Sequence, residues 1–192
     1  MDRVITMLGF LQRRAARLRA TSSSGSAAIE FAIVAPVLAL FLFGIIETGV
    51  IYYANSALTN AADDTARLVR TGQVQSQNLT KSQYIAQICS EMTGMISAMT
   101  CNSNLQVDME SFNSFTNANY TNVINSDGSL NVGAMQFTTG NACDTVLVRA
   151  FYPWSIMTPF MKSLMQNMPN GKFLITSASA FRNEPYTAGA SC

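Results

Sequence analysis

Residues 25–53 of this chain read GSAAIEFAIVAPVLALFLFGIIETGVIYY, and the stretch from Phe31 to Ile46 carries no charged side chain. A bilayer core of about 30 Å requires about 20 predominantly apolar residues in a helix. The segment from Gly25 to Tyr53 meets that length. The sequence therefore predicts one membrane-spanning helix near the N-terminus.

The charge on the two sides of this segment is unequal. Residues 1–25 contain five Arg and one acidic residue, Asp2, whereas no comparable basic cluster follows Tyr53. Basic flanks stay on the cytoplasmic side of a membrane. We therefore expect residues 1–25 to be a cytoplasmic leader and everything after the span to be exported. The leader is either a short amphipathic helix on anionic membrane lipid or an unstructured basic tag.

The composition excludes several kinds of chemistry. The chain contains no His, so it cannot build a Ser-His-Asp triad, a Cys-His dyad or an imidazole metal site. No C-x-x-C pair is present among the four Cys, which disfavours a zinc or thioredoxin-like site. From Gln73 onward the charges nearly balance, which disfavours nucleic-acid binding. We expect no catalytic residues, no metal and no cofactor, hence no enzyme.

The start of the apolar segment contains a short motif. Gly25 closes the basic leader, four small or apolar residues follow, and Glu30 precedes the apolar run. The run is too long for a cleaved secretory signal, and an ordinary signal anchor leaves the costly Glu30 unexplained. The motif resembles the processing site of type IV prepilins, in which a membrane peptidase cuts after the Gly. We expect Gly25 and its small neighbours to keep the Gly25–Ser26 bond extended and accessible.

The run from Gly25 to Gly72 has several further features: the AIEFA start with Glu30 and Phe31, Pro36 in the span, the Glu47-x-Gly49 step, an alanine-rich continuation, Arg67 and the close at Gly72. With these features the chain resembles the TadE-like family of Tad (tight adherence, Flp-type) pilus systems. The resemblance covers about a quarter of the chain and implies a minor pilin or pseudopilin whose N-terminal helix mediates assembly.

The resemblance also implies partners and a location. The partners are a prepilin peptidase, other pilin and minor pilin subunits, the inner-membrane pilus assembly machinery and membrane lipid. The protein would act in pilus assembly and surface adhesion, from the bacterial inner membrane with a periplasmic C-terminal domain, or from the extracellular pilus. The alternative is an uncleaved membrane-anchored periplasmic binding or adhesin module. A mature N-terminus at Ser26 or an intact leader distinguishes the two.

Glu30 would be the fifth residue of the cleaved chain. An unpaired carboxylate in a membrane or filament core costs several kcal/mol. Cleavage creates a positive α-amino group at Ser26, and we predict that Glu30 pairs with that group on a neighbouring subunit. Such a pair would fix the axial register between subunits.

The pattern after the span predicts an α+β fold, in which a long N-terminal transmembrane helix joins a small pilin-like domain of an antiparallel sheet and packed helices. The helix is expected from Ala28 to Thr71, so that residues 26–72 form the transmembrane and projecting segment and residues 73–192 the exported domain. In that domain we expect a helix over 81–99 and strands over 105–110, 145–152 and 172–182. A short helix is expected over 159–168, with Thr158 as its N-cap and with Met residues at helical spacing.

Four cysteines after the span indicate two disulfides in an oxidising compartment. Cys89 lies on the predicted buried face of its helix, and Cys101 follows shortly after that helix. Cys143 opens one core strand and Cys192 trails the last one, so an antiparallel pair of strands would bring them together. We predict the pairs Cys89–Cys101 and Cys143–Cys192.

Overall fold

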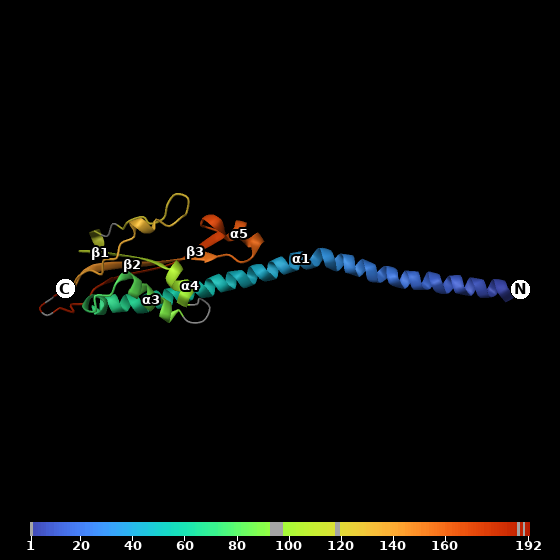
Figure 1. Ribbon diagram of the computed structural model, residues 1–192, viewed down its shortest axis with the longest axis horizontal. Helices are drawn as coiled ribbons and strands as arrows, with labels where there is room; N and C mark the ends of the chain where they lie inside the picture. Colours follow the sequence, from blue (N-terminus) through green and yellow to red (C-terminus); the bar gives the residue numbers. More distant parts are fainter. Residues whose placement is uncertain (1, 93–97, 118–119, 188, 190) are drawn as a thin grey trace. The chain divides into compact units, whose positions relative to one another are not determined.

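The computed structural model describes residues 2–92, 98–117, 120–187, 189 and 191–192 (Figure 1). The chain forms two compact units, residues 1–45 and residues 46–192. Helix α1 (Asp2–Arg70) runs through the first unit and into the second. A three-stranded antiparallel sheet and further helices complete the second unit, which confirms the predicted α+β fold.

Helix α1 begins much earlier than the sequence predicted. The expected start was Ala28, with an extended backbone at Gly25, but the backbone is helical from Asp2 onward. The leader is rich in Ala, Leu and Arg, which are strong helix formers, and a single Gly costs a helix only about 1 kcal/mol. The expectation of an extended Gly25–Ser26 bond was therefore wrong for the free chain. Pro36 lies within the helix without ending it.

The end of α1 was predicted correctly. Gly72 has φ 77°, in the left-handed region that favours glycine, and its N–H donates to the carbonyl of Val69 at 3.0 Å. A Cβ at this position would collide with the ring of Tyr186. Gly72 thus terminates the helix and also allows the C-terminal segment to pack against it.

The sheet has the strand order β1-β2-β3, with β1 over Gln106–Phe112, β2 over Thr145–Ser155 and β3 over Lys172–Arg182. Both pairs of strands are antiparallel, which confirms the three predicted strands. Strand β2 continues past its predicted end at Tyr152, through Pro153. Proline is tolerated there because β1 pairs with β2 only as far as Phe151, so the strand is an edge beyond that point.

The remaining helices are short: α2 (Gln73–Ser76), α3 (Lys81–Glu91), α4 (Ala98–Asn104) and α5 (Pro159–Met165). Thr80 and Gln83 form a capping box that starts α3 at its predicted position. Helix α3 ends at Glu91 instead of continuing to residue 99. Of its predicted buried face, Ile88, Cys89 and Met92 are buried, whereas Ile96 and the side chain of Met99 lie outside the described residues. In the described residues, 3-10 turns occur at Phe115–Asn117, Val132–Ala134 and Pro169–Gly171.

The main core lies between one face of the sheet and the helices. Within the second unit, α1 contributes Leu58 and Val69, α3 contributes Tyr84 and Ile88, and β1 and β2 contribute alternate residues such as Val107. Helices α3 and α4 lie on the same side of the sheet, opposite the long segment that connects β1 to β2 (Figure 1). Burial raises the pKa of the Tyr84 phenol to about 12.

The opposite face of the sheet carries a buried ionic cluster. Arg149 on β2 donates to Asp108 at 2.6 Å and to Glu110 at 3.1 Å, and also to the carbonyl of Thr121 at 2.7 Å. Both carboxylates are buried. Apolar and polar residues alternate over 105–110, a pattern that predicts a strand with one buried face, but the β1–β2 connection covers the polar face as well. The cluster fastens that connection to the sheet, with the Tyr120 ring over the guanidinium.

Candidate processing and assembly site

The apolar surface of α1 changes along its length. Most large apolar side chains between Ile29 and Ile46 are more than half exposed within the described chain, whereas Ile51, Leu58 and Val69 are buried. Residues 25–70 are long and apolar enough to cross a membrane, judged by length and composition. A helix that is apolar on all sides requires lipid or other protein around it. The N-terminal part of α1 therefore exposes apolar side chains that lipid or another protein must cover. The C-terminal part contributes side chains to the core of the second unit.

The predicted processing bond lies at the start of this exposed segment. Gly25 and Ser26 are both exposed, and a Cβ built on Gly25 has no other atom within 4 Å. Nothing in the described chain thus requires a glycine at this position, where it lowers helix stability. Any requirement for Gly25 must come from a partner molecule that approaches the backbone.

Within the part of the chain that the structure describes, the carboxylate of Glu30 bonds to a residue of its own helix. The Ser26 hydroxyl donates to its carboxylate at 3.1 Å, one helical turn away, and both residues are exposed. Phe31 is 71% exposed, and Pro36 is exposed as well. The structure thus leaves the predicted assembly residues Glu30, Phe31 and Pro36 on the surface.

Glu47 differs sharply from Glu30, because it is buried at 3% exposure. Its carboxylate accepts the backbone N–H of Met157 at 3.0 Å, the backbone N–H of Thr158 at 3.0 Å and the Thr158 hydroxyl at 2.8 Å. Hydrogen bonds to an ionised carboxylate are about twice as strong as neutral ones. Glu47 therefore fastens α1 to the segment that leads into α5.

Thr158 is the N-cap residue of α5 as predicted, and this contact explains why its side chain makes no capping bond. Thr158 precedes Pro159 at the start of α5, and its hydroxyl binds Glu47 instead. The sequence pattern indicated that Glu47 is an assembly residue, and it did not predict that Glu47 accepts hydrogen bonds from Met157 and Thr158. A carboxylate in an apolar segment indicates that some partner must stabilise it. It does not identify a partner 110 residues away in the sequence.

A second contact fastens α1 at its other end. The N–H of Glu184 donates to the carbonyl of Arg70 at 2.9 Å, and the two side chains form an ion pair at 3.3 Å. Between Glu47 and Arg70 the helix spans about 35 Å, close to the length of an 11-residue strand such as β2. Helix α1 therefore lies along the β2–β3 hairpin and is held at both ends of it.

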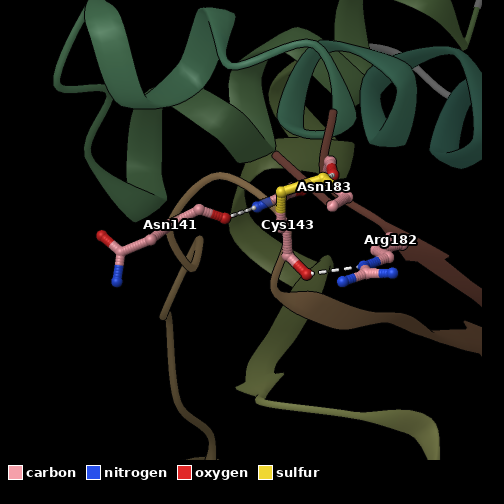
Figure 2. Close-up of a disulfide and its surroundings, with 5 residues drawn as sticks. Asn141, Cys143, Arg182 and Asn183 are labelled. Carbon is pink, nitrogen blue, oxygen red and sulfur yellow. Dashed lines mark hydrogen bonds between the residues drawn. A yellow bond between two sulfur atoms is a disulfide. The ribbon is translucent and has the colours of Figure 1, made fainter. Parts of the chain in front are cut away.

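Both predicted disulfides are confirmed. Cys89 at the end of α3 joins Cys101 in α4, and Cys143 before β2 joins the C-terminal Cys192. Figure 2 shows the second bond with its surroundings, where Arg182 donates to the Cys143 carbonyl at 2.8 Å and Asn183 donates to the Asn141 carbonyl at 2.9 Å. The C-terminus is thus tied to the start of the central strand.

No cluster of three or more potential metal ligands occurs within the part of the chain that the structure describes. Burial lowers the pKa of the Lys81 ammonium, while nearby Asp108 opposes that shift.

The family model described as TadE-like protein matches residues 25–67. No match was found among curated proteins or solved structures. The matched segment begins at Gly25 and contains Glu30, Pro36 and Glu47, so it confirms the resemblance found in the sequence. The match covers less than half of the chain, and a TadE-like segment suggests a Tad pilus-associated protein. The N-terminal segment of this chain is similar to TadE-like proteins, and its long apolar helix is consistent with a membrane anchor.

Proposed function

We propose that this chain is a minor pilin or pseudopilin of a Tad-type pilus, made as an inner-membrane precursor with a cytoplasmic leader over residues 1–25. The observation that carries this proposal is the exposed apolar surface between Ile29 and Ile46, which follows directly after an exposed Gly25–Ser26 bond. A prepilin peptidase cuts that bond, and the exposed helix then packs against other pilin subunits.

The second unit has a different role in this proposal. Its three-stranded sheet and two disulfides make a domain suited to an oxidising exterior. The contacts of Glu47 and Arg70 hold that domain on α1, so that force or movement applied to the helix reaches the sheet. The domain is presented at the pilus for assembly contacts and surface adhesion.

The test is the mature N-terminus of the protein isolated from cells. Intact-mass measurement should give a chain that begins at Ser26, and Gly25→Leu should abolish this processing because the side chain fills the space into which the peptidase must fit. Gly49→Leu is a matched control, since Gly49 is also exposed in α1 and a Cβ there has no neighbour within 4 Å. That variant should be cut normally.

Two outcomes would contradict the proposal. Normal cutting of Gly25→Leu would reject the assigned bond. An intact leader on the wild-type chain, in cells that contain an active prepilin peptidase, would favour the uncleaved membrane-anchored adhesin instead.

A further inference from the structure

Helix α5 carries an exposed apolar face. Met157, Phe160 and Leu164 are 67%, 71% and 76% exposed, and they form what we call the α5 patch. Phe160 and Leu164 lie four residues apart in α5, which places them on one side of that helix, and Met157 lies in the segment just before it. Exposed apolar clusters in a small domain mark a surface that another molecule covers.

The α5 patch lies beside the point at which the apolar run of α1 ends. Ile46 is the last residue of that run, and the next residue, Glu47, accepts the backbone N–H groups of Met157 and Thr158 at 3.0 Å each. Helix α5 begins at the following residue, Pro159. This proximity follows from chain connectivity and from contacts inside residues 46–192 alone.

The residues around the α5 patch are of the types found at the interface between a lipid bilayer and water. The segment 153–173 contains Lys162 and Lys172 but no acidic residue, and it includes Trp154, the only Trp of the chain. Tyr52 of α1 is 75% exposed and lines a groove with Met165 of α5. Aromatic and basic side chains are enriched where a protein leaves the hydrocarbon core.

We infer that the α5 patch lies in the membrane interface while the protein is anchored in the bilayer, so that lipid covers Met157, Phe160 and Leu164. The inference rests on the membrane anchor in the proposed function. Glu47 has the positioning role here, because its three hydrogen bonds keep α5 at the end of the span. A short amphipathic helix next to a transmembrane helix gains by burying its apolar face among headgroups and acyl chains.

The experiment uses the full-length chain in vesicles of phosphatidylethanolamine and phosphatidylglycerol. The structure shows no free cysteine among the described residues, so one introduced cysteine can carry an environment-sensitive fluorophore. Three variants are compared: Leu164→Cys in the patch, Leu38→Cys in the apolar run, and Gln73→Cys beyond the far end of α1. Each is measured with and without lipids that carry a nitroxide, placed near the headgroup for positions 164 and 73 and in the middle of the acyl chain for position 38.

We expect the nitroxide lipid to reduce fluorescence about twofold at position 164 and to leave position 73 almost unchanged. Quenching at position 38 but none at position 164 would overturn the inference and leave the anchor intact. A blue-shifted label at position 164 without quenching would also overturn it, because the patch would then be covered by protein. Absence of quenching at position 38 would reject the anchor and this inference together.

Discussion

Two glutamates on one helix illustrate two different uses of a costly carboxylate. Glu47 is buried and accepts three hydrogen bonds from the segment before α5. Glu30 is exposed and accepts one bond from Ser26, a residue one turn away. The chain therefore satisfies Glu47 by itself and leaves Glu30 for another molecule. The apolar residues next to Glu30, such as Ile29 and Phe31, are exposed, whereas those further along α1, such as Leu58 and Val69, are buried.

The largest effect that this comparison predicts is the loss of assembly on Glu30→Ala. Without the carboxylate, no group remains to pair with the α-amino group at Ser26 of a neighbour. We expect cleavage and membrane insertion to remain largely intact, because the cut lies five residues away, while incorporation into the pilus complex is abolished. Co-purification with the pilus machinery measures this, and wild-type recovery of the variant would refute the pairing.

The next effect concerns folding of the second unit. Glu47→Ala leaves two part-buried N–H groups and one hydroxyl without their acceptor, which should lower the free energy of unfolding by about 2–4 kcal/mol. Denaturant unfolding of the full chain in detergent, followed by Trp154 fluorescence, measures the loss. Glu30→Ala is the matched control and should unfold like the wild type. If both variants had the same free energy of unfolding, Glu47 would not stabilise the second unit more than Glu30 does.

A smaller effect distinguishes the two disulfides of the second unit. The bond Cys143–Cys192 closes a loop with a sequence separation of 49, and Cys89–Cys101 one of 12. Loop entropy predicts that replacing the longer pair by Ala costs about 1 kcal/mol more than replacing the shorter pair. The same unfolding assay compares the two double variants. The reverse order would show that local packing around α3 and α4 outweighs loop length.

Much of this architecture could be predicted from local patterns. The apolar run, the stop at Gly72, the β3 strand and both disulfides depend on residue type and spacing, and all four agree with the structure. The features that the sequence did not predict involve pairs of residues that are distant from each other in the sequence. The acceptor role of Glu47 depends on Thr158, and the burial of Asp108 depends on Arg149, a residue 41 positions away. The spacing of residues within one helix or strand does not predict which distant residues will pair.

The error at Gly25 has a different origin. Small residues indicated an extended bond, but helix propensity dominates in the chain by itself, and the backbone is helical there. A requirement imposed by an enzyme cannot be seen in the conformation of its free substrate. The sequence motif therefore describes the predicted encounter with the peptidase, and the structure describes the chain before that encounter.

The most direct test of the central claim is zero-length cross-linking of carboxylates to amines in isolated pili. Trypsin should release residues 26–67 of the mature chain as one peptide, because no Lys or Arg lies between Ser26 and Arg67. We predict that mass spectrometry finds this peptide joined through Glu30 to the N-terminal peptide of another pilin chain, and that Glu30→Gln abolishes the product. A cross-link confined to a single peptide, between Ser26 and Glu30 of the same chain, would contradict the account.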